Sequence, residues 1–169
     1  MLERKPNLSI GTFNFAHSFW QAGSALRTGD WAKGVSHASK PVEFLYWHAI
    51  ELFLKAFLLA SGISETDLRK STYGHNIRAL AREATDRGLR LKDRDSEVLS
   101  LMQTKDDMIE LRYITPGTRT VPEHEELETT CDNLYRVVGL ALVEKGISLG
   151  HHEVSIKSRI VTEETTSPS

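Results

Sequence analysis

The chain has 169 residues, of which 40% are hydrophobic and 26% are charged, and its formal net charge is −2. These values predict one folded domain and give no overall sign of nucleic-acid affinity. The single cysteine, Cys131, excludes an internal disulfide and a multi-cysteine metal site. The first residues, MLERKPNLSIG, lack the apolar core of a secretory signal, so a cytoplasmic protein is expected.

The first predicted element is a helix that Asn7 or Ser9 caps and that the sequence Thr28-Gly29-Asp30 ends. Its apolar and small residues recur every three or four positions, which is typical of an amphipathic helix; they are Ile10, Phe13, Ala16, Phe19, Trp20, Gly23 and Leu26. The sequence leaves the conformation of residues 31–40 open.

A long central helix is predicted over about residues 42–61, because FLYWHAIELFLKAFLLASG (Phe44 to Gly62) is apolar on nearly every side. Its charged or titratable residues, His48, Glu51 and Lys55, fall within roughly 60° of one another on a helix. A membrane span is disfavoured, since Glu and Lys near a bilayer centre cost roughly 2.5–3.5 kcal/mol each. The stretch therefore predicts a core helix with one polar stripe.

Shorter helices are expected after Ser64 and from Ile77 to about Gly88, with a turn or cap at residues 73–76 and a polar linker at 90–95. A further helix begins at Ser96 and ends at Pro116-Gly117, and the last long one runs from Pro122 to Gly146 with Cys131 on its inner face. Residues 154–157 alternate like a short strand, and residues 163–169 are expected to be disordered. The fold class is thus all-α, a bundle of four to five helices over residues 1–150, with a partly disordered extension at 151–169.

Arginine positions suggest two polar sites. Arg112 lies in phase with the apolar face of its helix, so it needs a buried partner, and Glu51 is the natural one. Residues 69–94 hold eight basic and three acidic residues. There, Arg78 and Arg82 are candidate phosphate contacts and are equally well explained as solvated surface. No motif indicates a metal or a cofactor.

Three ordered blocks, HAIELFLKAFLLASG (His48 to Gly62), YGHNIRAL (Tyr73 to Leu80) and ELRY (Glu110 to Tyr113), give a family resemblance. Over about Phe13 to Val143, the chain resembles the HEPN family (higher eukaryotes and prokaryotes nucleotide-binding), in its bacterial stand-alone branch. The resemblance implies an up-and-down helical bundle, usually a homodimer. In many members it implies a metal-independent endoribonuclease of toxin–antitoxin or defence systems, with Arg and His at the dimer cleft.

The chain departs from the nuclease pattern of that family. Arg112 and Tyr113 match the start of the motif, but Gly117, Thr118 and Arg119 stand where the catalytic His is expected. A second match, Arg119 with His124, begins in a loop and is broken by Pro122. His75 or His48 could serve in place of the absent histidine, which the sequence alone does not establish.

Three functions remain. The first is a HEPN-like protein with a degenerate nuclease motif that binds a nucleotide, RNA or a partner protein. Its polar centre would consist of Glu51, His75, Arg112, Tyr113, His48 and Lys55. The second is a ribonuclease toxin that uses Arg119 and His124, or Arg112 with a substitute histidine. The third is a structural dimerising module that partners a nucleotidyltransferase. The partner proteins considered for the chain are an antitoxin or a nucleotidyltransferase.

Overall fold

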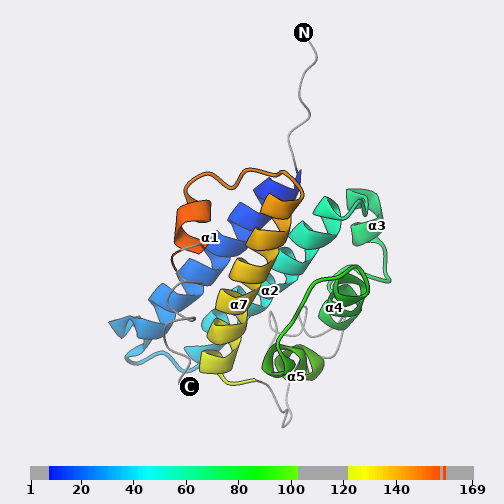
Figure 1. Cartoon of the computed structure of the whole chain (residues 1–169). Helices are drawn as coiled ribbons and strands as arrows, with labels where there is room; N and C mark the ends of the chain where they lie inside the picture. The colour runs from blue at the N-terminus through cyan, green and yellow to red at the C-terminus, as the bar shows by residue number, and fades with distance from the viewer. Residues whose placement is uncertain (1–7, 103–121, 157, 159–169) are drawn as a thin grey trace, which may run out of the picture.

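The computed structural model describes residues 8–102, 122–156 and 158, and every regular element in these ranges is a helix. The all-α prediction is therefore confirmed. The elements are α1 (Leu8–Thr28), the 3-10 turn η1 (Asp30–Ala32), α2 (Ser39–Ala60), α3 (Glu65–Arg69), α4 (Ile77–Asp86), α5 (Asp93–Leu101) and α7 (His124–Glu144), followed by a short helical segment at residues 152–156. Figure 1 shows α1, α2 and α7 side by side, with α4 and α5 together on one flank.

Helix α2 is the centre of the bundle. It contacts α1, α4 and α7, and each of its residues from 42 to 60 is buried or half-buried. Phe53 and Leu54 have no exposed surface, and Trp47 is only 1% exposed. The central helix predicted at about 42–61 is thus found, starting three residues earlier, with Pro41 in its first turn where a proline is tolerated. Within the described residues, no helix is both long and apolar enough to span a membrane.

Helix starts follow local capping chemistry. The Ser64 side chain accepts a hydrogen bond from the Asp67 backbone N–H and caps α3, as its sequence predicts. Asn76 caps α4 by accepting from the Ala79 backbone N–H. Glu123 and Glu126 form a reciprocal capping box at the start of α7. The predicted cap of the first helix is different: Ser9 lies inside α1 and is 2% exposed, while Asn7 lies outside the described residues.

Two predictions of local structure are wrong, a strand and a linker. The strand expected at 154–157 is helical at residues 154–156, because Leu149, His152 and Ile156 recur at helical spacing and are all buried. The alternation seen in the sequence spans too few residues to specify a strand. The linker expected at 90–95 already contains the first turn of α5, where the carboxylates of Asp93 and Asp95 favour a helix start.

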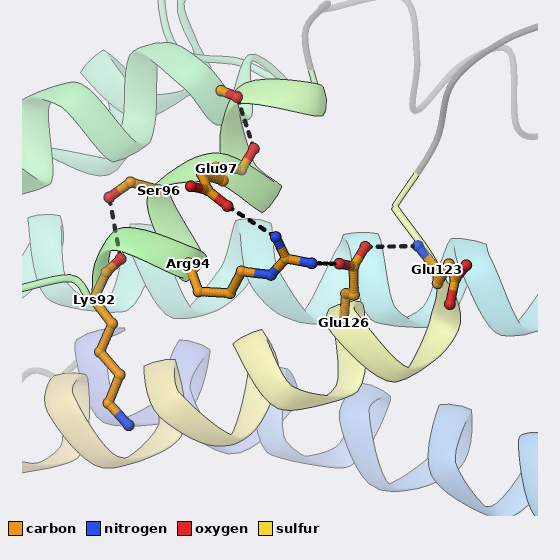
Figure 2. A network of polar contacts seen from close by, with 7 residues as sticks. Lys92, Arg94, Ser96, Glu97, Glu123 and Glu126 are labelled. Carbon is orange, nitrogen blue, oxygen red and sulfur yellow. Dashed lines mark hydrogen bonds and ion pairs between the residues drawn. The ribbon is translucent and has the colours of Figure 1, made fainter.

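A polar network joins α5 to α7 (Figure 2). The Arg94 guanidinium lies between the carboxylates of Glu97 and Glu126 and contacts both, and the second oxygen of Glu126 accepts from the Glu123 backbone N–H. Behind this exposed network, buried Asp95 accepts a hydrogen bond from the Asn133 amide at 3.0 Å. The α5–α7 contact therefore has a solvated layer and a buried layer.

Candidate functional site: a buried carboxylate between Lys55 and His75

The most polar position in the core of α2 is Glu51, which is 1% exposed. Its Oε1 accepts a hydrogen bond from Lys55 Nζ at 2.5 Å, one turn further along α2. Nδ1 of His75 lies 3.2 Å from Oε1 and 3.1 Å from Oε2. Because a buried carboxylate requires charged or hydrogen-bonding partners, this pairing accounts for its presence in an apolar helix.

The turn before α4 positions the His75 side chain next to Glu51. Residues 71–75 form turns, and the Gly74 backbone N–H donates to the Lys70 carbonyl at 2.8 Å. Gly74 has a φ of +29°, a backbone conformation that a residue with a side chain rarely adopts. With Asn76 capping α4, the imidazole of His75 is held at the N-terminal end of that helix, where α4 packs on α2.

Both partners of Glu51 reach solvent. The side chain of Lys55 is 17% exposed and that of His75 is 42% exposed, whereas Glu51 is enclosed. When Nδ1–H of His75 donates to the carboxylate, Nε2 keeps a lone pair available for a ligand. The cluster therefore presents an ammonium and an oriented imidazole to the surface above a fixed negative charge.

His48 lies at the edge of this cluster. Its Nδ1 is 4.0 Å from Glu51 Oε2, and its side chain is 25% exposed. The ring is held mainly by aromatic contacts: an edge-to-face contact with Phe19 at 4.4 Å between ring centroids and a stacked one with Phe44 at 6.0 Å. His48 thus borders the polar stripe without a short bond to Glu51.

The other candidate residues fall in different places. Arg112, Tyr113 and Arg119 lie outside the described residues, so the Glu51–Arg112 pair stays a prediction. His124 is the first residue of α7 and lines a pocket of about 450 Å³ with Glu43 and other residues at the N-terminal ends of α2 and α7. Glu43 precedes Glu51 by eight residues on the same helix, which is about 12 Å along its axis.

Arg78 and Arg82 line a smaller pocket of about 170 Å³ between α4 and α5. Its floor is apolar and includes Ala81 and Leu99. The Arg82 Nε atom is 4.0 Å from Asp86 Oδ2, and both side chains are largely exposed. These arginines therefore continue the polar surface of α4 beyond His75 and are not part of the buried cluster.

A second titratable cluster was not predicted from the sequence. Nδ1 of His152, which is 5% exposed, lies 3.0 Å from the Tyr135 hydroxyl of α7. The His17 ring of α1 lies edge-on to the His152 ring at 4.7 Å between centroids. The sequence indicated this cluster only through the position of His17. It lies four residues after Phe13, which is on the buried side of α1.

Within the described residues, no group of three or more His, Cys, Asp or Glu side chains could hold a metal ion. Comparisons of the chain with protein-family models, with curated proteins and with solved structures found no match.

Proposed function

We propose that the protein is a HEPN-like helical module that binds the phosphate group of a nucleotide or RNA at the Glu51–Lys55–His75 cluster. The observation that carries the proposal is the contact between Glu51 and His75, 24 residues apart, at 3.1 Å. These residues come from two of the three sequence blocks of the family resemblance. The proposal rests on this proximity of two blocks that are separate in the sequence.

The charges of the cluster suit an anion. Glu51 already balances the Lys55 ammonium, so a protonated His75 adds a net positive charge at the surface. When both ring nitrogens of His75 carry a proton, Nε2–H donates a charge-assisted hydrogen bond to a phosphate oxygen. Glu51 acts as the positioning residue, because it fixes the ring through Nδ1.

Binding is tested with a fluorescent single-stranded RNA and with mononucleotides as competitors. We expect His75→Ala to weaken binding by about 10- to 150-fold, since hydrogen bonds to charged groups contribute about 1.5–3 kcal/mol. Arg69→Ala is the matched control, because Arg69 is an exposed cation on α3 whose side chain pairs with Glu65. Unchanged RNA and nucleotide affinity in His75→Ala, with a normal melting temperature, would contradict the proposal and favour the purely structural role.

A metal-independent ribonuclease is a second candidate, and the orientation of His75 is the observation that favours it. A carboxylate on Nδ1 leaves Nε2 as a general base for the 2′-hydroxyl of RNA. This assigns the absent histidine's role to His75, with Arg112 as the phosphate contact. RNA cleavage in the presence of EDTA decides the question, with variants of His75, His124, Arg112 and Arg119 to alanine. Loss of cleavage in His124→Ala and Arg119→Ala alone would move the site to the start of α7.

A homodimer is also part of the proposal. Helix α1 carries no Asp, Glu, Lys or Arg before Arg27, and its outer face exposes Phe15 at 65%. An uncharged, partly apolar face of this length is typical of a surface covered by a second helix. We expect light scattering to give twice the monomer mass and Phe15→Glu to give the monomer. A wild-type protein that stays monomeric across the micromolar range would contradict the dimer. Co-purification would then test whether an antitoxin or a nucleotidyltransferase is the partner.

A further inference from the structure

The chain continues to pack on the bundle after the end of α7. After α7, residues 149–156 fold back on the bundle and bury Leu149, His152 and Ile156. We call this stretch the C-terminal segment. In Figure 1 its short helix lies beside α1, on the side of the bundle away from α4 and α5.

The C-terminal segment contacts both α1 and α7. Ile156 packs against Gly139 of α7, where a Cβ atom would lie 2.3 Å from Ile156 Cδ1. The His152 ring meets Phe13 of α1 edge-to-face at 5.6 Å between centroids. Two of the three anchors are thus ordinary apolar contacts, and the third is a titratable imidazole.

The surroundings of His152 disfavour a charge on its ring. The titratable groups packed around it are His17 from α1, Tyr135 from α7 and His151 from its own segment, with ring centroids 4.7, 5.7 and 4.0 Å away. Two of these gain positive charge on acidification, and burial keeps the Tyr135 phenol neutral by raising its pKa. Burial and, to a smaller extent, His151 lower the pKa of His152 below its usual value.

We propose that the C-terminal segment is a pH-sensitive latch that stays docked on α1 and α7 while His152 is neutral and is released when His152 takes up a proton. Protonation of His152 changes the hydrogen bond with Tyr135. Neutral Nδ1 can accept from the Tyr135 hydroxyl, whereas the protonated ring can only donate to the phenol oxygen, so the docked contact must rearrange. Release uncovers Gly139 and the buried rings of Phe13 and Tyr135, so the latch controls access to an apolar surface between α1 and α7.

The sign of the effect follows from proton linkage. The imidazole of a released segment titrates near its ordinary pKa of about 6.5, and the docked one titrates lower. Docking is therefore at full strength above about pH 6.5 and weakens as the pH falls below that value. Between pH 7.5 and 5.5 the opening equilibrium should therefore rise, by at most about tenfold for one proton taken up on release.

Hydrogen exchange of the intact chain tests the latch. We expect amide protection in residues 149–156, corrected for intrinsic exchange, to fall from pH 7.5 to pH 5.5 by at most about tenfold, while protection in α2 stays constant. His152→Leu keeps an apolar side chain without a titrating group, so its protection should not depend on pH. Equal protection of the wild type at both pH values would overturn the proposal.

An NMR titration of the wild type gives an answer even if His152→Leu fails to dock. The imidazole of His152 should titrate below the ordinary imidazole value of about 6.5. A His152 midpoint at or above that value would overturn the latch.

Discussion

Ile156 lies directly against the backbone of Gly139, so that a Cβ atom on Gly139 would be 2.3 Å from Ile156 Cδ1. Real Cβ contacts are never this short, and Leu149 and Phe13 close the other sides of the same position at 3.3 and 3.4 Å. A side chain at residue 139 therefore requires Ile156 Cδ1, the far end of a flexible side chain, to move within the packed segment.

We expect Gly139→Ala to destabilise the protein by about 1–3 kcal/mol, because overpacking outweighs the gain in helix propensity. Gly11→Ala is the matched control. Gly11 also lies inside a long helix, but a Cβ there meets nothing within 4 Å, so that substitution should stabilise by about 0.5–1 kcal/mol. Urea unfolding measures both. In a double-mutant cycle, Ile156→Ala should relieve part of the Gly139→Ala penalty, and strict additivity would contradict the direct contact.

The sequence was sufficient for the elements with long periodic patterns. The run from Phe44 to Gly62 is apolar on nearly every side, so it must be surrounded by other helices, and α2 does lie at the centre of the bundle. Cys131 was predicted as a small core residue from its spacing along the last helix, and it is fully buried. In both cases the pattern of apolar residues along a single helix was enough to predict which of its faces are buried.

Contacts between distant segments were not predictable to the same degree. The Glu51–Arg112 pair stays a prediction because Arg112 lies outside the described residues, and among those residues the shortest contact of Glu51 is with Lys55. The His152–Tyr135 contact was missed, because nothing local in a short tail segment shows which helix it will fold back on. The strand expected at 154–157 failed for the same reason: burial of Ile156 against α7 set the conformation.

The thiol of Cys131 should be inert in the folded protein. It is fully buried, and burial, reinforced by the nearby Glu128 carboxylate, raises the pKa of Cys131 well above its usual value. We expect no reaction with a thiol reagent at pH 8 under native conditions and one equivalent of reaction after denaturation. Rapid native labelling at this single cysteine would show that α7 opens locally and would contradict the packing described.

The two layers of the α5–α7 contact should differ in strength. Arg94 is exposed, so Arg94→Ala should change stability by no more than about 1 kcal/mol, with an effect that shrinks at high salt. Asp95→Ala removes the buried acceptor of the Asn133 amide and should destabilise by about 1–3 kcal/mol, nearly independent of salt. Figure 2 shows the exposed layer. Thermal melts at 50 mM and 500 mM NaCl separate the two, and an equal response to salt would contradict the assignment.

The polar stripe of α2 should be dispensable for folding. Glu51→Ala leaves the Lys55 ammonium and the His75 imidazole without their partner. Because both side chains reach solvent, the expected loss is about 1–3 kcal/mol, below that of a fully buried pair.

The double variant Glu51→Leu with Lys55→Leu removes the Glu51–Lys55 ion pair as a whole, and replacing buried ion pairs with apolar residues is often neutral or stabilising. We expect its free energy of unfolding to return to within about 1 kcal/mol of the wild type while RNA and nucleotide binding is lost. Urea unfolding and fluorescence anisotropy on the same samples give the two readouts. That outcome would mean that α2 keeps its charges for a ligand and not for stability. A double variant less stable than Glu51→Ala would mean the opposite, because the polar stripe would then stabilise the packing of α2 against α4.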